Sequence, residues 1–238
     1  DVERGVFRSK AECLRVCIDG PIALSRFTNL AGVSGHEGTS ALFVVDLSHY
    51  AIRKIATDKS ITTVAGTGGS ATTNGVGVLS AFKGLFDIAC DDQGFLFISE
   101  RGGANNIRLL DTTTGLVTTL VSGGIVGNSL TVNPAGTAVF AAIGTYQIAA
   151  YFTQAPVTAT PGNPTALPAL SFTVGLNGTD GAASGTRGVA RLSQPFMLDI
   201  DATTDELVVT HYTGHQVSRI RTVSGRNNKF AGSGTPAV

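Results

Sequence analysis

Short apolar runs separated by polar turns recur along the chain, and they follow one order. In each copy an apolar strand is followed by a turn, a second apolar strand, a polar stretch and a third strand that starts with Ile or Val. The first copy has its second and third strands at residues 42–46 and 52–55, and the next has them at 96–100 and 107–110. Apolar runs of this length, bounded by turn residues, predict β-strands.

Two more copies complete the pattern, at 138–142 with 148–151 and at 207–211 with 217–220. A fourth strand is predicted at 61–66, 117–120, 170–174 and 229–232, and a first strand at 30–34, 86–90, 130–132 and 197–200. Four strands in each repeat predict an all-β fold, a β-propeller of four-stranded antiparallel blades. The predicted blades cover residues 27–68, 82–122, 127–176 and 192–234, after an N-terminal segment, 1–26, interpreted as a closing strand or a linker.

Two segments of the first repeat resemble the NHL-repeat family. Residues 46–55 read DLSHYAIRKI and residues 62–68 read TTVAGTG, which match the family's strand, turn and strand endings. The resemblance is weakest in the third repeat, where Ala142 stands at the acidic position and a proline-rich stretch follows at 155–168. The repeat-motif positions that it implies are Asp46, His49, Tyr50, Arg53, Glu100, Arg108, His211, His215 and Arg219.

Two forms of the ring are compatible with this pattern. Either the chain is a complete small propeller closed by residues 1–20, or it supplies four blades of a larger ring, since the resemblance implies six blades more often than four. We favour the larger ring. An open arc leaves two blade faces bare, and these require a partner chain or further blades.

Composition and charge narrow the range of expected partners. Charged residues make up 14% of the chain, against a usual value of about 25%, and the formal net charge is zero. Because there is no sustained basic run, nucleic acid is not an expected partner. The most apolar stretch, 138–152, is too short and too interrupted for a transmembrane segment. The low charge and abundant Gly, Thr and Ser favour an extracellular or cell-surface setting, in which Asn177 is a glycosylation candidate.

Histidines and cysteines are the first candidates for chemistry. His211 and His215 have the spacing of a helical metal site, but they fall on a strand and its turn, so the repeat explains them better. His215 is predicted to share a turn position with Tyr50, and His211 to replace Asp46. Cys90 stands at an apolar inner-strand position, which predicts a buried structural role. Cys13 and Cys17 are expected either to bridge to another chain or to stay reduced.

The resemblance also implies an enzyme alternative, because some NHL-like propellers are zinc-dependent amidating lyases and other propellers are metal-dependent lactonases. Both use residues of the first strands in the central channel. Here Asp87 and Asp199 are the candidates, and two carboxylates suit Ca²⁺ better than zinc. No nucleophile constellation emerges, so no catalytic residues are assigned.

The sequence therefore predicts a non-catalytic protein–protein interaction scaffold without an obligatory cofactor, whose partners are other proteins or further blades. A metal-dependent lyase or hydrolase is the first alternative. An RNA-binding propeller, which would use the third-strand arginines, is the second.

Overall fold

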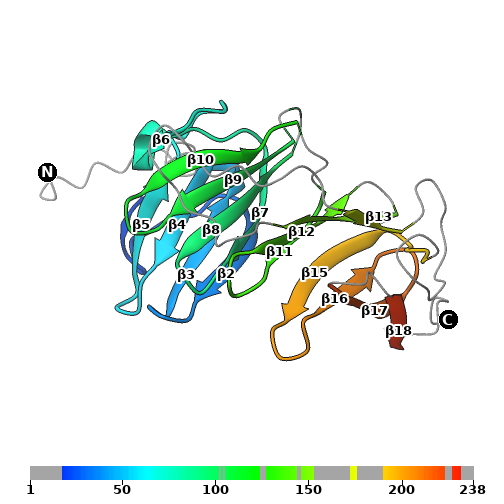
Figure 1. The fold of residues 1–238 in the computed structure, drawn as a ribbon. Helices are drawn as coiled ribbons and strands as arrows, with labels where there is room; N and C mark the ends of the chain where they lie inside the picture. The colour runs from blue at the N-terminus through cyan, green and yellow to red at the C-terminus, as the bar shows by residue number, and fades with distance from the viewer. Residues whose placement is uncertain are drawn as a thin grey trace, which may run out of the picture.

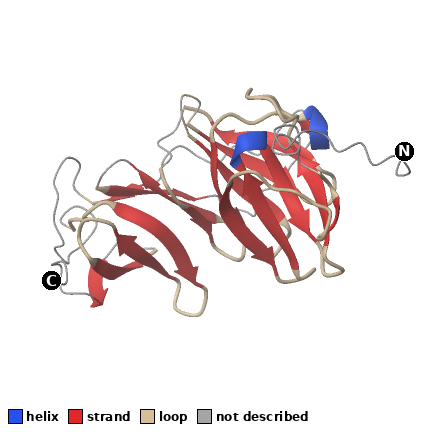
Figure 2. Cartoon of the chain, turned by 180° about the vertical axis from the view of Figure 1, so that it is seen from behind, coloured by secondary structure: helices blue, strands red, loops and turns tan. Residues whose placement is uncertain are grey.

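The computed structural model describes residues 18–101, 103, 105–123, 127–143, 146–152, 172–175, 190–222 and 227–231. These residues form four antiparallel sheets that follow one another in the chain and stand side by side as the blades of a β-propeller (Figure 1). Seen from behind, the short helical turns lie near the upper edge of the sheets (Figure 2). The propeller fold predicted from the repeats is confirmed.

Each sheet has the same up-and-down order, and its first strand is the innermost. Blade 1 contains β2 (Leu30–His36), β3 (Ala41–Asp46), β4 (Ala51–Ile55) and β5 (Ser60–Ala65). Blade 2 contains β7 (Leu85–Cys90), β8 (Phe95–Glu100), β9 (Asn106–Asp111) and β10 (Leu116–Val121). Blade 3 contains β11 (Leu130–Val132), β12 (Ala138–Ile143), β13 (Gln147–Phe152) and β14 (Phe172–Val174), and blade 4 contains β15 (Pro195–Asp201), β16 (Glu206–His211), β17 (Gln216–Arg221) and β18 (Asn227–Ala231).

Two short strands widen the first two blades. β1 (Gly20–Pro21) pairs with β5, and β6 (Gly75–Val76) pairs with β10. The described part of the N-terminal segment therefore lies at the outer edge of blade 1. Two 3₁₀ turns, η1 (Leu47–His49) and η2 (Gly77–Leu79), complete the regular structure of the described residues, which include no helix long and apolar enough to cross a membrane.

The second strand of each blade shows why the sheets stack. Its side chains alternate between the two faces, so in blades 2 and 3 one set contacts the preceding blade and the other set contacts the following blade. Phe43, Phe97 and Phe140 occupy the same position in β3, β8 and β12, and each is at most 2% exposed. Each phenylalanine joins a hydrophobic cluster shared with the next blade.

Blade 4 departs from this rule. The position of the three phenylalanines is taken by Val208, which is half-buried and lies between Glu206 and Thr210 on the same face. The cross-strand partners of Val208 and Glu206 on β17 are Arg219 and Arg221. The face of blade 4 that points away from blade 3 is therefore polar and charged.

Candidate functional site

A cavity of about 520 Å³ lies where the innermost strands of the four blades meet. It is lined by β2, β7, β11 and β15, by the turns that follow them, and by Val208 and Thr210 on the polar face of blade 4. We call it the central cleft. It runs from Val33 on blade 1 to Met197 on blade 4, and both of these apolar side chains are about half exposed or more, at 61% and 48%.

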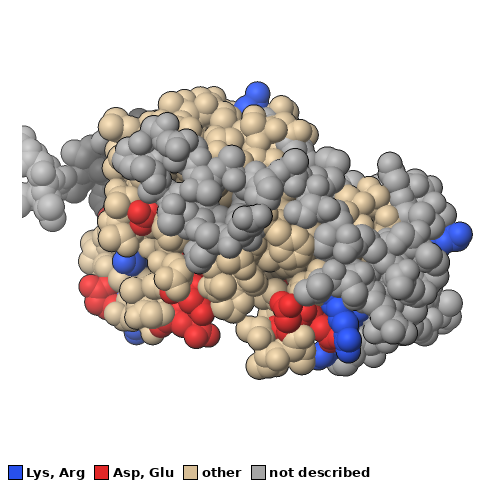
Figure 3. Space-filling model, viewed as in Figure 1, with Lys and Arg blue, Asp and Glu red and all other residues tan. Residues whose placement is uncertain are grey.

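The central cleft is acidic. Its described lining includes five carboxylates and no Lys, Arg or His, and the five are Glu37, Asp87, Asp91, Asp92 and Asp199. In Figure 3, Asp and Glu side chains lie along the lower edge of the molecule on both sides of an indentation, and Lys or Arg side chains adjoin those on the right. Low-dielectric walls around charges of one sign concentrate the field, which attracts cations.

The two predicted metal-binding residues both line the central cleft, but they differ in environment. Asp87 is 8% exposed, and its Oδ2 accepts hydrogen bonds from Ser129 Oγ and from the Leu130 amide, both at 2.9 Å. Its Oδ1 accepts from the Ile88 amide, also at 2.9 Å. Ser129 Oγ in turn accepts from the Leu198 amide at 3.1 Å. Asp87 thus ties β7 to β11, and Ser129 carries the connection to β15.

Burial raises the pKa of Asp87 despite these hydrogen bonds, which act in the opposite direction. Asp199 is exposed, and its Oδ1 accepts from the Ile200 amide at 2.8 Å. Within the described residues no group of three or more His, Cys, Asp or Glu side chains is placed to hold a metal ion. The calcium site of Asp87 and Asp199 stays a prediction.

Asp91 begins the turn between β7 and β8 and is 2% exposed. Its Oδ1 accepts from the amides of Gln93 and Phe95 at 3.0 and 2.8 Å, which closes the turn. Its Oδ2 is buried without a hydrogen-bond partner in the described structure. Burial raises the pKa of Asp91, and the negative charge of Asp92 raises it further. A buried carboxylate oxygen without a donor is unfavourable, and nearby positive charge relieves it.

The absence of a side chain at Gly136 leaves room for the carboxylate of Asp91. It has a φ of +67°, and a Cβ atom at this position would come within 2.3 Å of Asp91 Oδ2. The turn between β11 and β12 therefore needs glycine both for its backbone conformation and for its close approach to the carboxylate.

Cys90 is half-buried rather than enclosed. It packs against the core shared by blades 1 and 2, and it also lines the central cleft. Burial raises the pKa of its thiol to about 12, and the charges of Asp91 and Asp92 act in the same direction. Such a thiol stays protonated at neutral pH, so it is a poor nucleophile.

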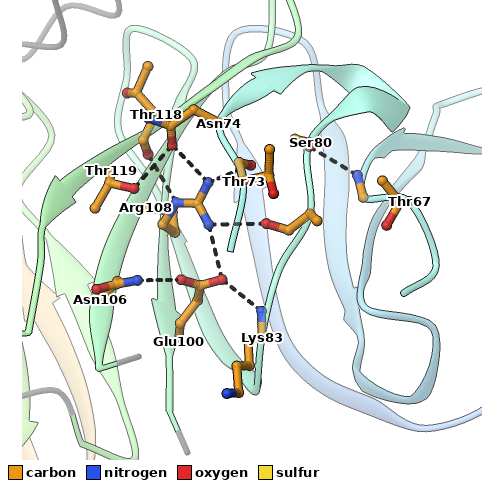
Figure 4. A network of polar contacts seen from close by, with 12 residues as sticks. Thr67, Thr73, Asn74, Ser80, Lys83, Glu100, Asn106, Arg108, Thr118 and Thr119 are labelled. Atoms are coloured by element: carbon orange, nitrogen blue, oxygen red, sulfur yellow. Dashed lines mark hydrogen bonds and ion pairs between the residues drawn. The ribbon is translucent and has the colours of Figure 1, made fainter. Parts of the chain in front are cut away.

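The acidic and arginine positions of the repeat form a buried network in blade 2 (Figure 4). Arg108 and Glu100 are fully buried, and Arg108 Nη1 lies 3.0 Å from Glu100 Oε1. Arg108 also donates to the carbonyl of Thr73 and to Asn74 Oδ1, both at 3.0 Å. Glu100 accepts from Asn106 Nδ2 at 2.9 Å. These groups join neighbouring strands and the preceding loop inside the blade, so they stabilise the fold.

Blade 1 repeats this arrangement with different partners. The fully buried Arg53 pairs with Asp19 at 2.8 Å and lies 3.8 Å from Asp46. His49 Nδ1 lies 3.2 Å from Asp46 Oδ1. Arg53 and Arg108 have no exposed surface, and therefore neither can contact RNA as the second alternative requires.

Blade 4 has a neutral pair where blades 1 and 2 have an arginine and an acidic residue. The structure also shows that a different residue of β17 takes the arginine position. Val44 pairs with Arg53 and Ile98 with Arg108, whereas the equivalent Val209 pairs with Ser218. The residue in the arginine position is thus Ser218, and Arg219 lies on the opposite face, 3.4 Å from Glu206. The third strand of blade 4 lies where the sequence predicts it, but its motif position is occupied by Ser218 and not by the predicted Arg219.

His211 occupies the acidic position of blade 4 and is 4% exposed. Its Nδ1 accepts from the Ser193 amide at 3.1 Å, so the neutral ring carries its proton on Nε2 and donates to Ser218 Oγ at 3.0 Å. Burial lowers the pKa of His211 to about 4. His215 is exposed with a φ of +43°, and Tyr50 and Asn105 have nearly the same φ at the equivalent turn. The repeat therefore accounts for both histidines.

Three predicted residues lie outside the described part of the chain: Asn177, Cys13 and Cys17. Sequence reasoning also missed three carboxylates of the central cleft: Glu37, Asp91 and Asp92. Their signal was acidic residues in the turns that follow the innermost strands of blades 1 and 2. That signal is weak, because Asp is common in turns anywhere.

Comparisons with known proteins place the chain in a structural class. No family model and no curated protein matches it. A chain of the nidogen/laminin complex matches with a TM-score of 0.59 and 14% identity over 85% of this chain and 65% of that one. Streptogramin B lyase matches with a TM-score of 0.56 and 13% identity over 90% and 57%. An auxiliary nutrient binding protein from Bacteroides ovatus matches with a TM-score of 0.53 and 16% identity over 91% and 61%.

These similarities define the class of protein as a β-propeller. At such low identity they carry the fold alone. The chain spans 57 to 65% of the length of the three structures. Membership of the NHL-repeat family stays a prediction.

Proposed function

We propose that this chain is a non-catalytic binding module and that a protein partner docks in the central cleft. The observation that carries the proposal is the cleft itself, a cavity of about 520 Å³ in which the exposed side chains of Val33 and Met197 lie beside carboxylates. In contrast, the polar repeat-motif residues Arg53, Arg108 and Glu100 are fully buried inside blades. The proposal includes an extracellular or cell-surface setting, supported by composition alone.

A metal-dependent lyase or hydrolase is the second candidate, because Asp87 and Asp199 both line the central cleft. The three hydrogen bonds that Asp87 accepts favour its structural role. Metal analysis of the purified protein separates the two candidates. Stoichiometric Zn²⁺ or Ca²⁺ that is bound by the wild type and lost in Asp199→Asn would favour the enzyme over the binding module.

Selection from a random peptide library tests the proposal. Peptides enriched on the wild-type protein should bind at least tenfold more weakly to Ala202→Trp, since Ala202 is exposed at the rim of the central cleft. Leu79→Trp is the matched control, because Leu79 is 75% exposed on η2 and does not line the cleft. If no peptide is enriched, or if Ala202→Trp binds as well as Leu79→Trp, the cleft is not a docking site.

A further inference from the structure

We infer that the partner segment received by the central cleft is basic, with Lys or Arg next to apolar side chains. This inference rests on the proposed function and names the chemistry of its partner. Its first support is that none of the five cleft carboxylates forms an ion pair with Lys, Arg or His in the described part of the chain. Other carboxylates here, such as Asp19, Glu100 and Glu206, are paired.

Asp91 is the second, independent support. Its side chain is 98% buried in the wall of the central cleft, given its 2% exposure, and Oδ2 has no donor among the described residues. Glu37, Asp87 and Asp92 line the same cleft and add negative charge. Positive charge in the cleft would stabilise the ionised form of Asp91 through the low-dielectric wall, without moving any side chain.

The apolar side chains that line the cleft indicate that its partner is larger than a simple cation. Val33, Met197 and Val208 line the central cleft on its two sides, and the first two are about half exposed or more. Covering them removes apolar surface from water, which is favourable. A segment that alternates basic and apolar side chains would contact the carboxylates and the apolar side chains of the cleft at the same time.

A further blade of the same kind is less suited than a basic segment to the side of the cleft that blade 4 forms. The three blades that are covered by a successor present Phe43, Phe97 or Phe140 to it, whereas blade 4 presents Val208 beside Glu206 and Arg219. Burying Arg221, which is 69% exposed, under another blade would remove its charge from water without a new partner on this chain. The polar face of blade 4 is therefore suited to bordering a solvated cleft.

Fluorescence anisotropy with three labelled hexapeptides tests the inference: alternating Arg and Leu, alternating Glu and Leu, and alternating Arg and Gly. The Arg–Leu peptide should bind at least tenfold more tightly than either of the others, and raising the salt concentration should weaken it. Asp92→Asn should weaken it roughly twofold to fivefold, and adding Glu37→Gln should weaken it by a similar further factor. Both residues are exposed, so neither change should unfold the protein.

Asp58→Asn is the charge-matched control, because Asp58 is exposed in the turn between β4 and β5 and lies outside the cleft lining. Equal binding of the Glu–Leu peptide, equal effects of Asp92→Asn and Asp58→Asn, or Arg–Gly binding as tight as Arg–Leu binding would overturn the inference. If selected peptides depend on Ala202 but lack Lys and Arg, the docking proposal stands and the basic partner is wrong. If no peptide depends on Ala202, both fail.

Discussion

Lowering the pH should destabilise this protein through one buried imidazole, that of His211. The unfolded chain binds a proton at this histidine below a pKa of about 6.5, whereas the folded chain does so only near pH 4. Between these values the unfolded state binds more protons, so stability falls as the pH falls. Above pH 6.5 both states are neutral and the contribution vanishes.

The expected magnitude follows from the two pKa values. Each pH unit within this window is worth about 1.4 kcal/mol, so His211 should remove about 2 kcal/mol between pH 7.5 and pH 5. The side chain is 4% exposed, so solvent screening calls for little reduction. The raised pKa values of Asp87 and Asp91 act in the opposite direction at acid pH, so the effect must be measured as a difference between variants.

Urea unfolding at pH 7.5 and pH 5, followed by circular dichroism, measures that difference. His211→Gln keeps an acceptor and a donor in place, and it should lose about 2 kcal/mol less than the wild type over this range. His215→Asn is the control, since its side chain is exposed and Asn tolerates the positive φ. The reasoning is refuted if the wild type and His211→Gln lose the same stability on acidification.

Three further predictions concern the free energy of unfolding at neutral pH, measured with urea. Arg108→Met should cost about 3–5 kcal/mol because it leaves Glu100 buried and unpaired, and adding Glu100→Met should restore part of the loss; a double variant less stable than Arg108→Met would contradict this. Phe97→Ala should cost about 3–5 kcal/mol, whereas Val208→Ala should cost under about 1 kcal/mol, and equal losses would mean that blade 4 is covered as blade 2 is. Gly136→Ala should cost more than about 1 kcal/mol through its φ and its clash with Asp91, and a neutral result would exclude that contact.

Local pattern was enough to predict the blades. Alternation with period two decides which residues of β3, β8, β12 and β16 lie on which face, and repetition identifies the four copies. It also explained His215, because the turn position that it shares with Tyr50 is defined by a short stretch of backbone. Such features depend on neighbours in sequence, so they can be read before any tertiary contact is known.

The central cleft depended on the tertiary structure. Glu37 lies in a turn of blade 1 and Asp91 and Asp92 in a turn of blade 2, and only the stacking of the sheets brings them around one cavity. The choice between Ser218 and Arg219 likewise depended on strand register, since a shift of one residue moves a side chain to the opposite face. The sequence by itself determined the repeat and the faces of each blade, because both follow from backbone periodicity. The acidic lining and the exposed polar face of blade 4 were decided by packing between blades, which no single repeat encodes.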